Sequence, residues 1–444
     1  MTDTRTPRPR LLVIGGGQAG LTAAARAAVG GAEVTVLEVS REPGGSARFA
    51  GYIWTAPTRE VMATENPDGD PVLRDALVDG FADAVEWIRS TGVEVGDAQR
   101  ILPFGRGHQF DTNHYLDTCR ALVVQHGGTV LLETQTEELL LEEGVVVGAR
   151  VRTGGGESRE IRADHTLLAT GGFQGDPELR EELIGPLVGT LPLRSNPHSQ
   201  GAGLRLARAV GAAVGAEGAG FYGHLIPSGV PFADSSDFVE LSLYYSEHAL
   251  LFNLHGERFV DETLGDHLTT LALAEQPEAR GLLIADARVH RDWIVPAYVE
   301  GAIGADKFAI ASRRGGRVGL AESLEELEYL PEEWGYDGAT IRRAVEEFNA
   351  ATVTDEGATP GRRLDPAPLL DPPYYVIETI PAITFPFTGV RIDAQARVLD
   401  EGGAPIAGLL AAGSDTGGLW NRAYAGGLAS ATVFGLAAAR TSLT

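Results

Sequence analysis

The stretch Leu11-Leu12-Val13-Ile14-Gly15-Gly16-Gly17-Gln18-Ala19-Gly20 decides the fold of this 444-residue chain. Its first four residues form a short apolar run, which is typical of a strand buried on both faces. The alanine-rich segment 21–29 predicts a helix that ends at the glycine pair 30–31, and 34–38 predicts the next strand. Strand, glycine turn, helix and strand within about 30 residues make a βαβ unit.

The glycine spacing in this stretch predicts a phosphate-binding turn. In Gly15-x-Gly17-x-x-Gly20, the three glycines serve the tight turn, the close approach of backbone to a pyrophosphate, and helix–strand packing. Free N–H groups at the start of the helix would then face the phosphates. Glu38 stands at the end of the second strand, where an acid accepts hydrogen bonds from ribose hydroxyls. Motif, context and acid together predict a dinucleotide site.

Further glycine segments distinguish between NAD and FAD. The segment 43–46 places a second glycine pair just beyond the acid, and apolar strands end in glycine at 168–172 and 408–413. NAD needs one such backbone platform, whereas FAD stretches across the sheet and needs several. The sequence therefore favours FAD.

Composition excludes several other classes of protein. Lys plus Arg (36) against Asp plus Glu (61) gives a net charge of −25, which argues against nucleic acid or an anionic membrane surface as a partner. The single cysteine, Cys119, excludes a disulfide framework, and no His/Asp/Glu spacing predicts a metal site. No apolar run is long enough for a membrane span and no signal peptide opens the chain, so we expect a cytoplasmic protein.

The composition of the sequence changes in the middle of the chain, and the last part again resembles the first. Between 215 and 370, aromatics, histidines and prolines increase, and amphipathic helices are expected at 324–329 and 339–351. The last part again has glycine-rich turns, a buried strand and an alanine-rich helix from Gly427. We therefore expect 1–214 and 371–444 to form one discontinuous domain, with 215–370 inserted as a second.

These motifs resemble the fumarate reductase and 3-ketosteroid dehydrogenase flavoprotein superfamily over nearly the whole chain. The segments that carry the resemblance are 15–20 with Glu38, 43–46, 168–173, 201–204, 253–262, 397–400, 408–415 and 433–435. The resemblance implies an α/β fold, with a Rossmann-like FAD-binding domain (GR2-type) interrupted by an α+β capping domain and the active site at their interface. It also implies chemistry at a carbon–carbon bond next to a carbonyl or carboxylate.

The same resemblance implies where FAD is held. Glu38 would bind the adenosine ribose, Asp415 the ribityl chain, and the amides of 427–429 the pyrimidine end of the flavin, where a helix N-terminus stabilises negative charge. The family's covalently flavinylated branch carries a histidine shortly after the second glycine pair; 45–50 has none, so non-covalent FAD is expected. The full set of expected FAD contacts is Gly15, Gly16, Gly17, Gln18, Ala19, Gly20, Glu38, Val39, Gly44, Gly45, Ser46, Thr136, Ala169, Thr170, Gly171, Gly203, Gly413, Asp415, Gly427, Leu428 and Ala429.

The residue that moves the proton differs between branches of the resembled family. Four residues after the glutamate of the Arg-Phe-Val-x-Glu segment, the dicarboxylate branch has an arginine and the ketosteroid branch a tyrosine. Here that position is Asp266, followed by His267. Both side chains are competent proton acceptors, so both are candidate catalytic residues; the alternative is a solvated pair in a loop.

A second difference lies in the C-terminal glycine loop. Tyr424 stands where the dicarboxylate branch has an arginine, and 424–427 resembles the ketosteroid branch. Its hydroxyl and the Leu428 amide would form a neutral electrophile for a ketone or enolate oxygen. Arg422 argues the other way, because a guanidinium clamps a carboxylate. Further candidates for substrate contact are His108, Tyr245 and Trp420.

Together these features predict an FAD-dependent oxidoreductase acting on CH–CH groups. We expect it to dehydrogenate or reduce a bond α,β to the carbonyl of a cyclic or bulky ketone, with hydride passing to or from flavin N5. One alternative is a fumarate-reductase-like enzyme whose unsaturated carboxylate is held by Arg422 and His108. A second is a flavin-binding electron-transfer protein. The expected partners are a small-molecule substrate and an electron donor or acceptor of unknown identity.

Overall fold

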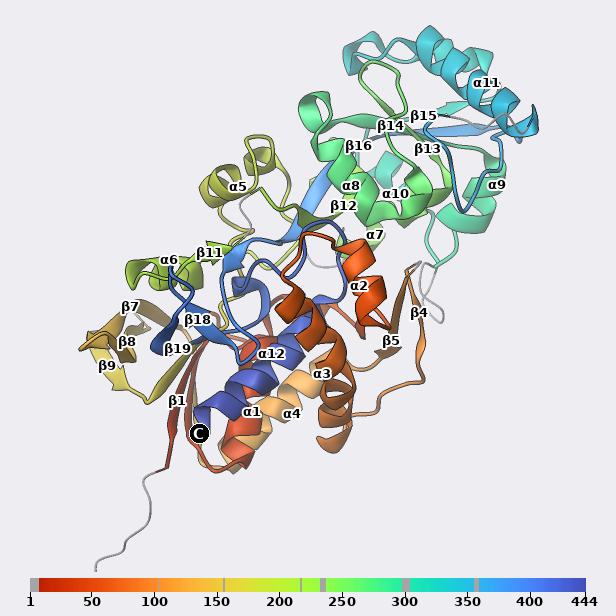
Figure 1. Cartoon of the computed structure of the whole chain (residues 1–444). Coiled ribbons are helices and arrows are strands. Elements are labelled where there is room, and N and C mark those ends of the chain that lie inside the picture. The colour runs from red at the N-terminus through yellow and green to blue at the C-terminus, as the bar shows by residue number, and fades with distance from the viewer. Residues whose placement is uncertain are drawn as a thin grey trace, which may run out of the picture. The chain divides into compact units, whose positions relative to one another are not determined.

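The computed structural model describes residues 8–102, 104–154, 156–215, 218–231, 237–297, 304–354 and 359–444 (Figure 1). Its contacts divide the chain into two compact units. Unit 1 comprises Met1–Gly185, Ser195–Phe221 and Phe385–Thr444, and unit 2 comprises Pro186–Arg194 and Tyr222–Thr384. Unit 1 is therefore built from three separate pieces of the chain.

Unit 1 holds most of the strands. Its strands are β1 (Arg10–Ile14), β2 (Glu33–Leu37), β3 (Tyr52–Thr55), β4 (Gln99–Ile101), β5 (Gly105–Gln109), β6 (Thr129–Leu131), β7 (Thr134–Glu142), β8 (Val145–Thr153), β9 (Ser158–Arg162), β10 (His165–Leu168), β11 (Val214–Gly215), β17 (Gly389–Val390), β18 (Arg397–Leu399) and β19 (Pro405–Ala411). Its helices are α1 (Gln18–Val29), α2 (Arg59–Glu65), α3 (Pro71–Ser90), α4 (Thr112–Gln125), α5 (Pro177–Leu183), α6 (Ala202–Ala209) and α12 (Gly427–Ser442).

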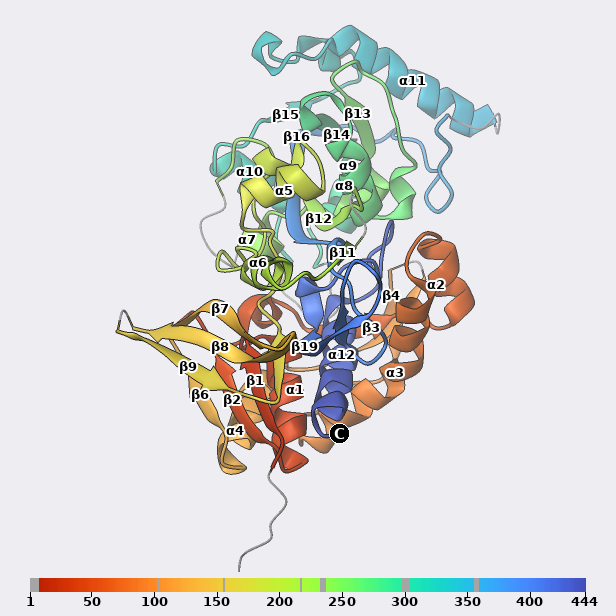
Figure 2. The same ribbon diagram turned by 60° about the vertical axis from the view of Figure 1, so that its left-hand side comes forward.

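The central sheet of unit 1 has six strands in the order β18-β19-β10-β1-β2-β6. All neighbours pair in parallel except β18 and β19. The smaller antiparallel sheet β7-β8-β9 is yellow to orange in Figure 2. The order places β1, which carries the glycine turn, in the middle of the sheet, as in a Rossmann-like fold.

Small side chains allow the helices of unit 1 to pack closely. Helix α1 lies against α12 and α4, and α12 also packs on α3. Alanines line α1, and their short side chains let the neighbouring backbones approach one another. The buried ones are Ala19, Ala23, Ala24, Ala25, Ala27 and Ala28. The alanine-rich composition of α1 thus favours close packing as well as helix formation.

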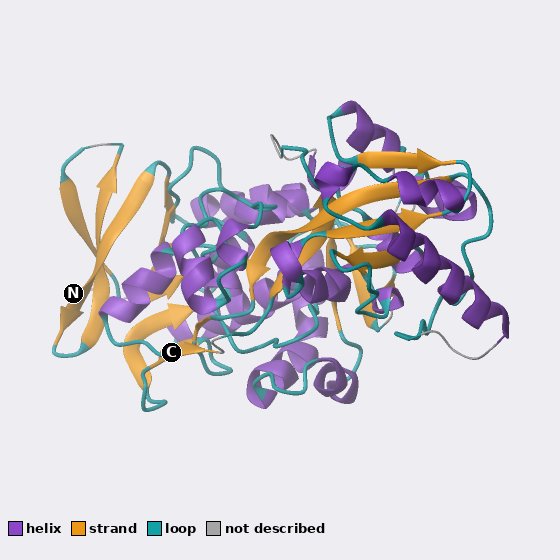
Figure 3. Ribbon diagram, turned by 90° about the horizontal axis from the view of Figure 1, so that it is seen from above, coloured by secondary structure: helices purple, strands orange, loops and turns teal. Residues whose placement is uncertain are grey.

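Unit 2 is organised around an antiparallel sheet in the order β12-β16-β14-β13, with β15 also paired to β16; Figure 3 shows strands in orange and helices in purple. The strands are β12 (Phe221–Pro227), β13 (Leu250–Asn253), β14 (Gly281–Ala285), β15 (Val318–Ala321) and β16 (Tyr374–Pro386), and the helices are α7 (Asp237–Glu240), α8 (Asp266–Ala274), α9 (Ala287–Val289), α10 (Lys307–Arg313) and α11 (Gly338–Thr354). Apolar residues of β13, β14 and β16 form its core together with Ile341 and Val345 of α11.

One local expectation needs correction. The segment 324–329 forms a short 3₁₀ helix, Glu325–Tyr329, because Pro331 follows and prevents a longer α-helix. Strand β17 is short and covers Gly389–Val390. The helix expected at 339–351 is present as α11. Strand β16 pairs with β14 and β15 of unit 2 as far as Thr379.

Candidate functional site

The turn between β1 and α1 is shaped for a ligand that approaches its backbone. Gly15 has a φ of +111°, and a Cβ there would lie 2.1 Å from the carbonyl oxygen of Ala169. A Cβ on Gly20 would lie 2.0 Å from the Gly15 oxygen. No side-chain hydrogen bond caps α1 at Gly17, so the helix N-terminus offers its N–H groups to an anion.

Glu38 is held in place at the end of β2. Its Oε2 accepts the Gly16 N–H at 2.9 Å, and its Oε1 accepts the backbone N–H and the hydroxyl of Ser40 at 2.9 and 2.7 Å. The side chain is buried, with 8% exposure. A carboxylate has about four lone-pair positions, so its orientation is fixed while it can still accept further hydrogen bonds from a ribose diol. The neighbouring Val39 is exposed.

The second glycine pair lies beside the first glycine turn. Gly44 forms a parallel bridge with Gly17, and its N–H donates to the Gly16 oxygen at 2.8 Å. Gly45 begins a 3₁₀ helix, and the Ser46 hydroxyl is 2.9 Å from the Ser195 hydroxyl. The two segments that the sequence assigned to FAD are therefore neighbours in space.

Asp415 connects three other expected FAD segments. Its carboxylate accepts the N–H and hydroxyl of Thr170 and, at 2.9 Å, the N–H of Gly172. The Thr170 hydroxyl in turn accepts the Gly203 N–H at 2.9 Å. Burial raises the pKa of Asp415, while these donors favour its ionised form. The carboxylate therefore aligns the loop after β10 with the start of α6. Gly413, two residues before it, faces Ala19 of α1.

Two of the expected FAD contacts have a buried polar atom without a hydrogen-bond partner among the described residues. These atoms are Oε1 of Gln18, at the start of α1, and Oγ1 of Thr136, on β7. Buried polar groups are almost always paired in folded proteins, so each of these atoms indicates a missing ligand or water. Together with the glycine cradle and Glu38, they fit FAD.

The N-terminus of α12 is closed by a tyrosine. The Gly427 N–H donates to the Tyr424 hydroxyl at 2.8 Å, and the N-cap residue, Gly426, makes no side-chain hydrogen bond to the helix. Leu428 and Ala429 follow in the first turn, where backbone N–H groups lack partners within the helix. The positive end of the helix dipole lies here, so this turn favours negative charge on whatever it faces.

Aromatic rings surround Tyr424. Its ring centroid lies 5.2 Å from that of Trp54, 5.5 Å from Phe385 and 5.7 Å from Trp420. Trp420 is buried, and its indole N–H has no hydrogen-bond partner among the described residues. Arg422 is exposed at the surface of unit 1, and its backbone N–H donates to the Asn66 side chain. The loop thus presents one half-buried phenol in an apolar wall.

His108 lies on β5 in another part of unit 1. Its Nδ1 is 2.8 Å from the Gly96 oxygen, and its ring stacks on Phe81. The His108 ring is therefore held by a hydrogen bond to the backbone and by an aromatic contact.

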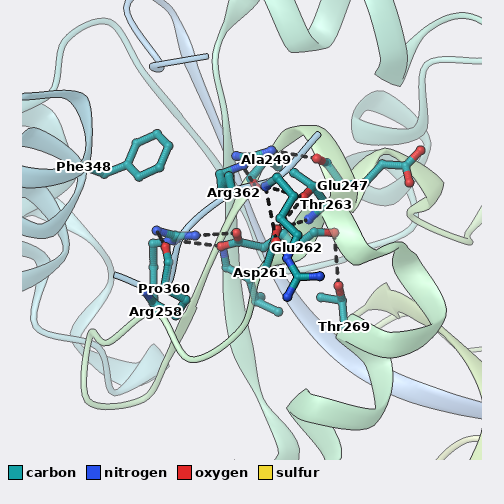
Figure 4. A network of polar contacts seen from close by, with 12 residues as sticks. Glu247, Ala249, Arg258, Asp261, Glu262, Thr263, Thr269, Phe348, Pro360 and Arg362 are labelled. Atoms are coloured by element: carbon teal, nitrogen blue, oxygen red, sulfur yellow. Dashed lines mark hydrogen bonds and ion pairs between the residues drawn. The ribbon is translucent and has the colours of Figure 1, made fainter. Parts of the chain in front are cut away.

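In unit 2, a buried ion pair anchors the segment that precedes Asp266 (Figure 4). Glu262 is fully buried; it accepts Nε and Nη2 of Arg258 at 2.9 and 2.6 Å, and the N–H of Leu251 at 3.0 Å. Arg258 also donates to the Pro360 oxygen. The Arg-Phe-Val-x-Glu segment is therefore a structural clamp that fixes the start of α8.

Asp266 is the first residue of α8 and is buried against β12. Its carboxylate makes a short contact with Nδ1 of His224 and accepts the Leu225 N–H at 3.2 Å. Burial raises the pKa of Asp266 to about 7. Burial, with the cations Arg194 and Lys307 nearby, holds the pKa of His224 well below its usual value. Asp266 is thus a buried, paired carboxyl group and not a solvated loop residue.

The remaining two candidates of unit 2 are also buried. His267 has 7% exposure, and its ring centroid lies 5.5 Å from that of Tyr222. Tyr245 packs in the hydrophobic core of unit 2, and burial raises the pKa of its phenol. The structure places the first beside the Asp266 pair and the second within the core.

Sequence reasoning missed the polar role of His224 and Tyr222. Neither residue was among the expected site residues, although the His224 Nε2 lies 2.9 Å from the Tyr222 hydroxyl. Alternating polar residues on one strand face were the available signal, but their partner is 42 residues away at Asp266. Within the described ranges, no group of His, Cys, Asp or Glu side chains could hold a metal ion. No described helix is long and apolar enough to span a bilayer.

The chain is similar to several flavoproteins. It is 25% identical to a fumarate reductase (cytochrome) of Shewanella frigidimarina over 94% of this chain and 73% of that protein. It is 27% identical to a 4-oxocyclohexanecarboxylate 2-dehydrogenase of Sinomonas cyclohexanicum, over 95% and 90% of the two chains. Its fold matches a 3-ketosteroid Δ1-dehydrogenase of Sterolibacterium denitrificans with a TM-score of 0.80, at 18% identity over 98% of this chain and 99% of that one.

The family assignment rests on nearly the whole length of the chain. A family profile described as an FAD binding domain matches residues 10–430. This range begins at β1 and extends into α12, so it includes the glycine turn, Glu38 and the C-terminal glycine loop. This chain belongs to the FAD-binding-domain family of flavoproteins, and FAD is its cofactor.

Proposed function

We propose that this chain is an FAD-dependent oxidoreductase that reduces or dehydrogenates a carbon–carbon bond next to the carbonyl of a cyclic or bulky ketone. One observation carries the choice of a ketone: the Tyr424 hydroxyl lies at the N-terminus of α12 in a wall of aromatic rings. A neutral donor in apolar surroundings suits an uncharged carbonyl oxygen.

The hydrogen bond from Gly427 prepares Tyr424 to donate. Because its oxygen accepts the Gly427 N–H, its own proton has to be directed to a different acceptor. In the proposal that acceptor is the substrate carbonyl oxygen, which gains negative charge as the bond to the neighbouring carbons changes. The buried N–H of Trp420 supplies a second donor in the same wall.

FAD, when bound, supplies or accepts the hydride. The residues that would hold it are the β1–α1 glycine turn, Glu38, the second glycine pair and the first turn of α12. Asp415 keeps the loops around the cofactor aligned by its hydrogen bonds to Thr170 and Gly172. The first turn of α12 would stabilise negative charge through its free N–H groups.

The proton that accompanies the hydride is assigned to unit 2. Asp266 has a pKa of about 7 because it is buried, so near neutral pH it can both release and take up a proton. Its carboxyl is bonded to His224, which provides a route for that proton. His267, the other candidate, is adjacent in sequence.

Two resemblances bear on the substrate class. The similarity to a dehydrogenase of 4-oxocyclohexanecarboxylate supports a cyclic ketone. A second candidate function, reduction of an unsaturated carboxylate, is favoured by the similarity to a fumarate reductase and by Arg422, an exposed cation two residues from Tyr424. The ketone is preferred because Tyr424, unlike Arg422, lies within the aromatic wall.

A panel of oxidants tests the proposal directly. The purified holoenzyme is reduced anaerobically, and reoxidation of its flavin is followed by absorbance after addition of cyclic enones, cinnamate-like monocarboxylates or fumarate. We expect cyclic enones to give the fastest reoxidation. Reoxidation by carboxylates alone would overturn the ketone assignment, and reoxidation by none of them would overturn C–C bond chemistry in favour of an electron-transfer role.

A further inference from the structure

A line of three polar side chains connects the buried Asp266 to the less buried edge of β12 in unit 2. The Asp266 carboxyl contacts Nδ1 of His224, and Nε2 of the same ring lies 2.9 Å from the Tyr222 hydroxyl. Asp266 and His224 are 8% and 6% exposed, whereas Tyr222 is half-buried. The three groups come from β12 and the start of α8.

We propose that Tyr222 is the residue that exchanges a proton with the substrate, and that His224 and Asp266 resupply it. This inference rests on the proposed function, since it assigns a further catalytic residue to the same reaction. It moves the contact with the substrate from Asp266 to Tyr222. His224 and Asp266 become positioning residues that act through the phenol.

The hydrogen bonds of Asp266 support this transfer of roles. One oxygen contacts His224 and the other accepts the Leu225 N–H, so both carboxyl oxygens are used inside unit 2. With only 8% of the residue exposed, little of the Asp266 carboxyl is left accessible to a substrate atom. Tyr222 stands at the other end of the line, and its phenol is the most exposed of the three groups.

The proton balance follows from the line of hydrogen bonds. In the reductive direction, the Tyr222 O–H bond breaks and its proton forms a C–H bond at the substrate carbon next to the carbonyl. The phenolate oxygen takes the proton from Nε2 of His224, and Nδ1 takes the proton of the Asp266 carboxyl. One proton has left Asp266, which ends as a carboxylate; dehydrogenation reverses each transfer.

Positive charges around the line stabilise that carboxylate. Arg194 donates to the Ser242 and Tyr244 hydroxyls at 2.8 and 3.0 Å, and the Tyr244 ring lies 5.1 Å from that of His224. Lys307 lies 5.3 Å from the Tyr244 ring centroid. Both cations disfavour a protonated His224 and favour an ionised Asp266, so the imidazole passes the proton on and does not keep it.

The charged and titratable groups that face Asp266 or His224 come from several elements. They are Tyr222 on β12, His267 on α8, Glu247 and Tyr244 on the 3₁₀ helix Tyr244–His248, Lys307 on α10, and Arg194. Glu247 carries a further carboxyl group near Asp266, and burial raises its pKa. The pH dependence of the reaction rate therefore has to be compared between wild type and variants that each change one of these groups.

The central test is the single-turnover rate of enone reduction by the reduced holoenzyme, with Tyr222→Phe beside wild type. We expect Tyr222→Phe to slow this step about 10²–10⁴-fold, the usual contribution of a positioned acid. Asp266→Asn should slow it as well and should remove the pH dependence centred near 7. Because Asp266 acts through Tyr222, the double variant with both substitutions, Tyr222→Phe and Asp266→Asn, should be about as slow as the slower single variant. Tyr329→Phe, at an exposed tyrosine of unit 2, is the matched control and should react like wild type.

A second measurement does not depend on turnover. Side-chain ¹⁵N shifts of His224 in the oxidised holoenzyme report which ring nitrogen carries the proton. We expect Tyr222→Phe to shift the Nε2 resonance and Asp266→Asn the Nδ1 resonance, with Tyr329→Phe leaving both unchanged. If wild type reduces enones and Tyr222→Phe does so equally fast, the role of Tyr222 is wrong while the proposed function stands. If wild type reduces no member of the panel, the proposed function itself is wrong.

Discussion

At the scale of single residues, Tyr424 shows how one hydrogen bond defines the chemistry of a side chain. The Gly427 N–H donates to the phenol oxygen, which fixes the position of the hydroxyl and directs its own proton to a different acceptor. The surrounding rings of Trp54, Phe385 and Trp420 limit the water around it, which strengthens any hydrogen bond it makes. A donor of this kind stabilises charge that develops on an oxygen during the reaction.

Replacing Tyr424 by Phe removes that donor and keeps the ring. We expect the rate of enone reduction to fall about 10²-fold, as for the loss of one oxyanion donor. Flavin binding should change little, and this is checked by fluorescence titration with FAD. A rate equal to that of wild type would exclude Tyr424 from the reacting site.

The shifted pKa values of Asp266 and His224 give opposite pH dependences of stability. Asp266 has a folded-state pKa of about 7, above its ordinary value of 3.8, so its favourable contribution is present below pH 3.8 and is lost as the pH rises toward 7. His224 has a lowered pKa, so its contribution increases as the pH rises through its ordinary value of 6.5. Asp266→Asn removes the first effect. The stability of this variant relative to wild type should therefore rise between about pH 4 and pH 7, as measured by urea unfolding. A pH-independent difference would contradict the raised pKa.

At the scale of elements, local patterns were predictable from the sequence and long-range pairings were not. The turn at 15–20 and the flanking β1, α1 and β2 follow from glycine spacing and apolar runs, which are local signals. Helix α3 begins at Pro71, because Asp70 caps it and proline suits the first helical position. The pairing of β12 with β16 joins strands far apart in the chain, and no local pattern specifies it. The His224–Asp266 contact depends on that same long-range arrangement.

The segment before α8 depends on the buried pair of Arg258 and Glu262. Both side chains are at most 5% exposed, so removal of one charge leaves the other buried without its partner. We expect Glu262→Gln to lower the free energy of unfolding by about 3–5 kcal/mol. The exposed i,i+4 pair Arg343–Glu347 on α11 is the control, and Glu347→Gln should have little effect. Equal effects in the two variants would contradict the clamp assigned to Glu262.

The loop before α12 requires glycine at 426 for two separate reasons. Gly426 has a φ of +96°, and a Cβ there would lie 1.7 Å from the Trp54 carbonyl oxygen. Gly418 also has a positive φ, but a Cβ there meets no described atom within 4 Å. Gly418→Ala should therefore lose about 1–2 kcal/mol from backbone strain alone. Gly426→Ala should lose more, and displacement of Trp54 from Tyr424 should also reduce enone turnover. Thermal unfolding and single-turnover rates measure the two effects.

At the scale of the whole molecule, the net charge of −25 acts on charged reaction partners. A strongly negative protein attracts cations and repels anions at long range. We expect reduction of the flavin by a cationic viologen radical to be faster than reduction by an anionic viologen of similar potential. The difference should shrink as salt is added, because the screening length falls to about 10 Å at 0.1 M ionic strength. Stopped-flow measurements at several salt concentrations check this, and rates independent of donor charge would contradict it.

The order of the chain has a consequence for how the protein is made. Unit 1 contains β19 between β10 and β18, and α12 packs on α1, yet both elements lie in the last 40 residues. Asp415, which ties the loop after β10 to the start of α6, also lies there. During synthesis, every segment of unit 2 leaves the ribosome before these elements do. The nascent chain therefore carries a β10 strand with an open edge until β19 has left the ribosome, and its FAD cradle is completed only once α12 has followed. We therefore expect a truncation before β19 to abolish cofactor binding while leaving the whole sequence of unit 2 intact.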